Sequence, residues 1–111
     1  MAVIPVALAG RAYDVVIEEG LLGQLAEAAA PFLKGYGPAR PVPFVADSNT
    51  HRLFAGGIDA HLAANGLAAE WFVVEPGEDA KTWPVLERLC DWLLALGVTR
   101  KDYVFGLGGG V

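Results

Sequence analysis

The sequence predicts an α/β fold in which helices connect the strands of a parallel sheet, preceded by an N-terminal β-hairpin. Three short apolar runs, at 44–46, 71–74 and 103–107, are separated by stretches in which apolar residues recur every three or four positions. The first seventeen residues instead contain two extended runs close together. Alternating strands and helices of these lengths favour right-handed crossovers and parallel pairing.

The opening hairpin is predicted from residues 3–8 and 13–17, which flank Gly10 and Arg11. Apolar and polar residues alternate in the second run, so one face of the hairpin is expected to be solvated. Pro5 cannot donate to a ladder, which places the first strand at an edge.

A single crossover helix is predicted after Gly20, and we expect it to end at Lys34 and Gly35. Its apolar face is formed by Leu22, Leu25, Ala29, Phe32 and Leu33. The next segment, 35–43, is predicted as a loop because of its glycines and prolines.

The buried strand at 44–46 is followed by Asp47, Ser48 and Asn49, any of which can cap the next helix. One apolar stripe of that helix is expected to contain Phe54, Ile58 and Leu62. The pair Gly56-Gly57 predicts a bend or a split in this helix.

The strand at 71–74 is expected to be buried and to end at Glu75-Pro76-Gly77. Thr82 is then the expected N-cap of a helix that ends near Gly97, a residue suited to the C′ position. The apolar face of this helix is predicted as Leu86, Leu89, Leu93 and Leu96. A last buried strand at 103–107 leads into Gly108, Gly109 and Gly110.

Composition limits the possible partners. The formal net charge is −5 and basic residues form no cluster, which argues against nucleic acid and anionic membranes as partners. One cysteine and the absence of a signal-peptide pattern predict a cytoplasmic protein. His51 and His61 lack further ligands at suitable spacing, so no metal site is expected in this chain.

Ligands of such sheets bind beyond the carboxyl ends of the strands. Three turns are expected to meet there, at 47–49, 76–81 and 108–110. An acid after a strand can accept ribose hydroxyls, and glycine amides can hold a pyrophosphate, so the combination predicts a dinucleotide. The usual Rossmann fingerprint is absent, because Asp47 precedes the glycines by about sixty residues instead of following them by about 20. The expected domain is therefore Rossmann-like, and it is incomplete because no helix follows the glycines.

The segments VADSN, PGEDAKT and DYVFGLGGGV, in this order and spacing, resemble the N-terminal domain of the 3-dehydroquinate synthase family. The opening hairpin is also similar, so the resemblance covers residues 1–111. It implies that the cofactor is NAD. The residues that it implies for binding are Asp47, Asn49, Gly77, Glu78, Lys81, Gly109, Gly110 and Val111.

Enzymes of this family convert a phosphorylated seven-carbon sugar acid to 3-dehydroquinate and phosphate in the shikimate pathway. The resemblance implies NAD and a zinc or cobalt ion, whose ligands belong to a helical C-terminal domain outside residues 1–111. The chain alone is therefore expected to be inactive. A sheet face left partly bare by a missing helix predicts self-association or marginal stability of the isolated chain. For the complete protein we expect a homodimer. Two alternatives stay open: the N-terminal domain of a metal-dependent polyol dehydrogenase of the glycerol type, and a non-catalytic nucleotide-binding module.

Overall fold

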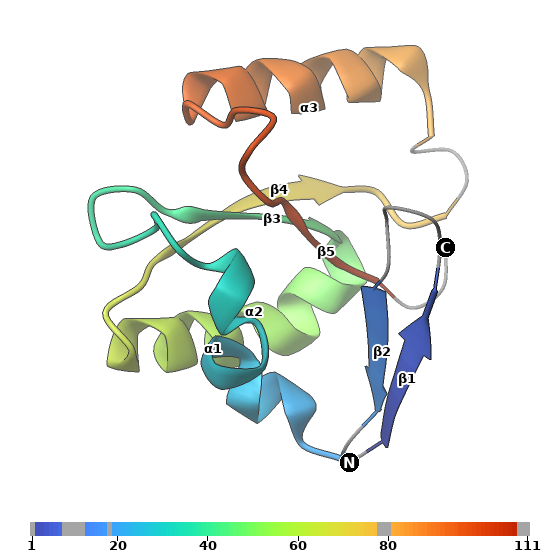
Figure 1. Cartoon of the computed structure of the whole chain (residues 1–111). Coiled ribbons are helices and arrows are strands. Elements are labelled where there is room, and N and C mark those ends of the chain that lie inside the picture. The colour runs from blue at the N-terminus through green and yellow to red at the C-terminus, as the bar shows by residue number, and fades with distance from the viewer. Residues whose placement is uncertain (1, 8–12, 18, 78–80, 109–111) are drawn as a thin grey trace.

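The computed structural model describes residues 2–7, 13–17, 19–77 and 81–108. The main sheet contains three parallel strands in the order β4-β3-β5. Their bounds are Val42–Asp47 for β3, Ala69–Val74 for β4 and Phe105–Leu107 for β5. Helix α2 (Ser48–Ala64) lies on one face and α3 (Trp83–Ala95) lies on the other (Figure 1). The predicted α/β class with a parallel sheet and crossover helices is confirmed.

The predicted hairpin is also confirmed. Strands β1 (Ala2–Val6) and β2 (Tyr13–Ile17) pair antiparallel, with Val3 opposite Val16. They form a separate two-stranded sheet beside the main one (Figure 1). Every residue of β2 is exposed, so both of its faces are open to solvent, whereas the sequence predicted only one.

The prediction of a single helix between Gly20 and Lys34 is wrong. The structure has three short helical segments there: η1 (Leu21–Gln24), α1 (Leu25–Ala28) and η2 (Ala30–Phe32). Pro31 lacks an N–H and its ring clashes with the carbonyl four residues earlier, so a continuous helix cannot pass this point. The apolar periodicity still directs Ala29 and Leu33 into the core.

Strand β3 begins at Val42, two residues before the predicted start. Pro43 had suggested a loop, yet it lies fully buried in the central strand. The Val42 N–H donates to Ala68 O on the β4 side at 2.8 Å. Since alternate residues of a strand point to opposite neighbours, the Pro43 nitrogen faces β5, whose register begins only at Phe44. The proline therefore removes no ladder hydrogen bond.

Helix α2 runs unbroken for 17 residues, so the predicted split at Gly56-Gly57 does not occur. Each glycine costs about 1 kcal/mol relative to alanine, which the burial of neighbouring apolar side chains outweighs. The buried positions are Ala55, Ile58 and Leu62. Phe54, expected on this stripe, is 41% exposed.

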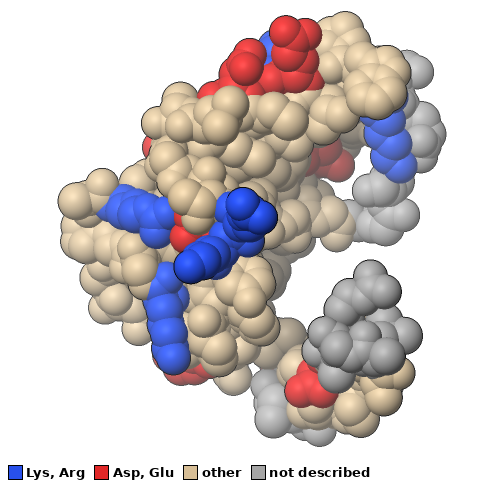
Figure 2. Space-filling model, turned by 45° about the horizontal axis from the view of Figure 1, so that its top comes forward, with Lys and Arg blue, Asp and Glu red and all other residues tan. Residues whose placement is uncertain are grey.

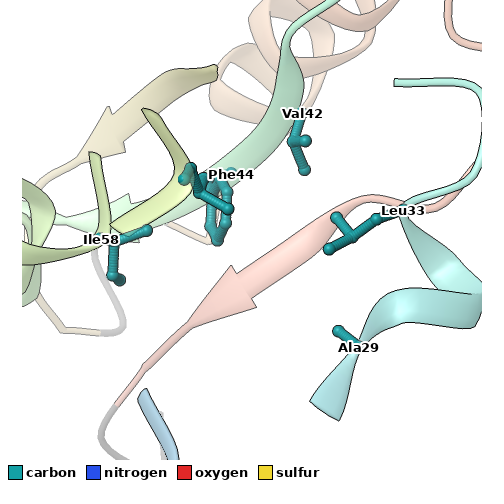
Figure 3. Packing of buried hydrophobic residues seen from close by; sticks show 6 residues of the cluster. Ala29, Leu33, Val42, Phe44 and Ile58 are labelled. Carbon is teal, nitrogen blue, oxygen red and sulfur yellow. The ribbon is translucent and has the colours of Figure 1, made fainter. Parts of the chain in front are cut away.

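The core lies between the main sheet and helix α2. Its buried cluster joins β3 to α2 and to the residues that flank η2 (Figure 3). The members are Ala29, Leu33, Val42, Phe44, Ile58 and Leu62. Val42 and Phe44 are two positions apart, so they project from the same face of β3.

The opposite face is packed more loosely. No described residue of α3 is fully buried, although Trp92 reaches Phe72 of β4 with ring centroids 5.4 Å apart. The fully buried strands predicted at 71–74 and 103–107 are only partly buried. Tyr103 and Val104 are exposed and precede β5, which pairs with β3 alone in the described sheet.

The ends of α3 agree with prediction. The Thr82 hydroxyl accepts from the Val85 N–H at 3.4 Å, and Gly97 adopts a φ of 75° just after the helix. No helix in the described part of the chain is long and apolar enough to cross a membrane.

Candidate functional site

The carboxyl ends of the three parallel strands meet at one edge of the sheet. Asp47 lies opposite Val74 in the β3–β4 register, and Ala46 lies opposite Leu107 in the β3–β5 register. The last residues of these strands and the residues that follow them line a cavity of about 370 Å³. The cavity is lined by Val45, Ala46, Asp47, Val74, Glu75, Gly77, Lys81, Gly106, Leu107 and Gly108. Each of the three predicted turns contributes at least one described residue to this lining: Asp47, Gly77 with Lys81, and Gly108.

Asp47 is both the last residue of β3 and the N-cap of α2. Its Oδ1 accepts the Thr50 N–H at 2.7 Å, and the Thr50 hydroxyl lies 3.1 Å from the same oxygen. The backbone hydrogen bond from Thr50 is the main reason that the pKa of Asp47 lies below its ordinary value. A carboxylate therefore occupies the positive end of α2.

This ionised cap decides which ligand groups suit the α2 terminus. A phosphate there would meet a negative charge, whereas a hydroxyl can donate to the carboxylate. Both hydrogen bonds from Thr50 end on Oδ1, and a carboxylate has about four lone-pair sites. The cap role and a ligand role are thus compatible in Asp47.

Thr50 was not identified from the sequence. Its Oγ1 lies 3.2 Å from the carbonyl oxygen of Leu107, at the end of β5. The spacing Asp-x-x-Thr indicates an N-cap contact, but the contact with Leu107 depends on the sheet register. Only the structure could reveal that Thr50 joins two of the turns.

Charges of both signs border the cavity. Asp47 and Glu75 are acidic, and Lys81 is basic. On the face shown in Figure 2, the Lys and Arg side chains are spread out and form no continuous basic field. The volume is within the range of small-molecule sites, about 300–1,000 Å³. Such a lining fits a ligand that carries both hydroxyl and anionic groups better than a polyanion.

The structure brings some of the predicted binding residues together. Asp47, Gly77 and Lys81 line the cavity. Gly77 has a φ of 94°, a conformation that favours glycine in this turn. Asn49 is exposed in the first turn of α2 and does not belong to the lining. The other predicted residues, Glu78, Gly109, Gly110 and Val111, lie outside the described residues.

The described residues include no group of three His, Cys, Asp or Glu side chains that could hold a metal ion. His61 has a structural contact instead, because its Nε2 accepts the Ala26 N–H at 3.0 Å. This hydrogen bond connects α2 to α1. The same Nε2 lies 3.9 Å from Glu27 Oε2 in α1.

Comparison with known proteins finds relatives that share one name. No protein-family model matches the chain. A 3-dehydroquinate synthase of Ruegeria pomeroyi is 38% identical over 111 residues, which is all of this chain and 29% of that protein. The 3-dehydroquinate synthase of a Jannaschia species is 40% identical over 109 residues, and that of Caulobacter vibrioides is 39% identical over 108. Each of these two matches covers 97% of this chain and 28% of the relative.

The chain thus spans little more than a quarter of the length of these relatives. Within that span the similarity is continuous from the opening hairpin to the glycine-rich end. Over its whole length, the chain is therefore similar to part of proteins named 3-dehydroquinate synthase.

Proposed function

We propose that this chain is the NAD-binding part of a 3-dehydroquinate synthase. The observation that carries the proposal is the cavity at the carboxyl edge of the sheet, where Asp47, Gly77 and Lys81 meet. Its position agrees with the site at which open α/β sheets bind ligands. The similarity to 3-dehydroquinate synthases supports NAD as the cofactor.

Asp47 has the clearest role. The carboxylate is held by Thr50 and kept ionised, so it can accept hydrogen bonds from the hydroxyls of the adenosine ribose. Because the capping bonds fix its position, binding requires little further ordering of this side chain.

The other residues are assigned by charge and by family position. Lys81 borders the cavity and offers a positive charge to the phosphates. Gly77 shapes the turn that carries Glu78, a further acceptor for ribose hydroxyls. Asn49 assists on the adenosine side. Residues 109–111 are proposed to follow the pyrophosphate with their backbone amides.

The whole protein would convert 3-deoxy-D-arabino-heptulosonate 7-phosphate to 3-dehydroquinate and phosphate. NAD, when bound, supplies a reversible acceptor of hydride for this conversion. The residues of this chain bind and orient it, while zinc or cobalt and the sugar phosphate are held by parts of the family that these residues do not span. The 111 residues alone are therefore proposed to be inactive. We further propose a homodimer in the cytoplasm.

Calorimetric titration of the 111-residue chain with NAD tests this function. The Ruegeria pomeroyi relative, titrated in parallel, is the positive control. Saturable binding by both proteins, with phosphate released from the sugar phosphate only by the relative, is the expected result. Binding by the relative with none by the chain would contradict an NAD site made from these residues. Phosphate release by the chain alone would contradict its inactivity.

A further inference from the structure

Thr50 has one hydroxyl proton and three oxygen atoms within reach. Its Oγ1 lies 3.1 Å from Asp47 Oδ1, 3.2 Å from Leu107 O and 3.3 Å from Asp47 O. All three can only accept, and a hydroxyl donates one proton. Hydroxyl hydrogen bonds are usually about 2.7–2.8 Å long. The three distances are longer than this, and the single proton can be donated fully to only one acceptor at a time.

These acceptors belong to two different strands. Asp47 ends β3, and Leu107 ends β5 immediately before Gly108. The β3–β5 register has its last pair at Ala46 and Leu107. The Thr50 hydroxyl therefore acts where the ladder stops, and it connects the helix cap to the strand that leads into the glycines.

We propose that Thr50 is a positioning residue that couples the Asp47 carboxylate to the carbonyl of Leu107 through its one hydroxyl proton. Its assignment to cofactor binding rests on the proposed NAD function, whereas the coupling itself does not. A ligand hydroxyl can donate to the lone pairs of the Asp47 carboxylate that Thr50 leaves open. Thr50 would meanwhile hold this carboxylate and the Leu107 carbonyl in place relative to each other.

The direction of the coupling follows from the charge of Asp47. The ionised carboxylate attracts the Thr50 proton, and a protonated carboxyl attracts it much less. The other described ionisable groups that line this cavity are Glu75 and Lys81. His51 lies four positions further along the chain than Asp47, and its ring packs edge-on against Trp71. Because other ionisable groups are present, the test must isolate the Thr50 hydroxyl.

The experiment follows two NMR signals of the 111-residue chain, from pH 7 down to the lowest pH at which circular dichroism shows the chain folded: the Asp47 carboxyl carbon and the Gly108 amide. The Gly108 N–H shares its peptide group with Leu107 O, so its shift reports the hydrogen bond to that oxygen. In the wild type both signals should titrate with one midpoint. Thr50→Ser keeps the hydroxyl and should retain the common midpoint. Thr50→Val keeps the shape, and the Gly108 amide should no longer follow Asp47.

A merely structural role of Thr50 predicts a different outcome, because packing loss would move both signals at every pH without uncoupling them. The coupling is overturned if the Gly108 amide of the wild type ignores the Asp47 titration. It is also overturned if the valine variant, shown by circular dichroism to be folded, keeps the common midpoint.

Calorimetric titration of the same three proteins with NAD tests the cofactor role. Loss of one charge-assisted hydrogen bond should weaken binding by Thr50→Val roughly tenfold, and Thr50→Ser should restore most of it. Equal affinity of all three would overturn the positioning role. If none binds NAD while the NMR coupling persists, the proposed function fails and the Thr50 coupling is supported.

Discussion

Arg40 Nη2 lies 2.6 Å from Asp102 Oδ2, although 62 positions separate the two residues. Arg40 comes before β3 and Asp102 before β5, so the pair joins the loops at the amino edge of the sheet, opposite the cavity. The same Asp102 oxygen accepts the Thr99 N–H at 2.8 Å. The Arg40 guanidinium also lies 4.8 Å from the ring centre of Tyr36. One carboxylate thus closes its own turn and holds the two loops together.

The two carboxylates with lowered pKa values predict that the chain loses stability in acid. Hydrogen bonds from Thr99 and Arg40 lower the pKa of Asp102, and those from Thr50 lower that of Asp47. A group whose pKa is lower in the folded state stabilises the fold above its unfolded pKa, 3.8. This contribution is lost as the pH falls through the folded pKa. These two groups should therefore change the urea concentration at the unfolding midpoint little between pH 7 and pH 5. Below about pH 4 the midpoint should decline.

Asp102→Asn is the control for this pH dependence. The amide keeps the shape of the side chain but cannot ionise, so the variant should be less stable than the wild type at pH 7. The difference between the two proteins should shrink as the pH approaches 2.5. A constant difference at all pH values would show that the charge of Asp102 does not contribute.

The sequence predicted the parts of the fold that depend on local patterns. Thr82 and Gly97 mark the two ends of α3 because capping is a property of neighbouring residues. The hairpin, the strand order along the chain and the parallel class follow from periodicity in the same way. The helix before residue 34 was wrong because apolar spacing outweighed Pro31, whose local effect prevailed.

Other features depend on tertiary context and could not be predicted. Pro43 is tolerated in β3 only because β5 does not pair at that level. Exposure of the hairpin and of Tyr103 depends on which surfaces are covered, which no local pattern specifies. At the site, the family resemblance pointed to Asp47, Gly77 and Lys81, which line the cavity, whereas Thr50 required knowledge of the end of β5.

Leu62→Ala should be among the most destabilising single changes in the chain. Leu62 is 0% exposed in the cluster between α2 and the sheet. Removing its side chain loses apolar burial and leaves a cavity, at a cost of about 2–5 kcal/mol. Urea unfolding with a constant m-value would measure it. Leu94→Ala is the matched control, because Leu94 is 73% exposed and its truncation should change stability by no more than about 0.5 kcal/mol.

Substitution of Gly97 and of Gly56 by alanine should change the free energy of unfolding in opposite directions. Neither Gly97 nor Gly56 has a neighbouring atom within 4 Å of the position that an alanine Cβ would occupy, so sterics with other residues do not decide the outcome. Gly97 has a φ of 75°, which costs an alanine about 1–2 kcal/mol. Gly56 lies inside α2, where alanine should gain about 0.5–1 kcal/mol. Thermal melts of the two variants should shift in opposite directions. A stabilising Gly97→Ala would contradict the conformational argument.

Substitution of Asp47 should separate its structural role from its binding role. Asparagine is about as good an N-cap as aspartate, so Asp47→Asn should keep α2 and most of the thermal stability at pH 7. A neutral amide is a weaker acceptor than a carboxylate, so NAD affinity should fall roughly tenfold. Asp47→Ala removes the cap as well, and this variant should lose both thermal stability and binding. Melting curves and calorimetric titrations of the two variants would measure these effects. Unchanged NAD affinity in a folded Asp47→Asn protein would remove Asp47 from the binding site and leave it as the cap of α2 alone.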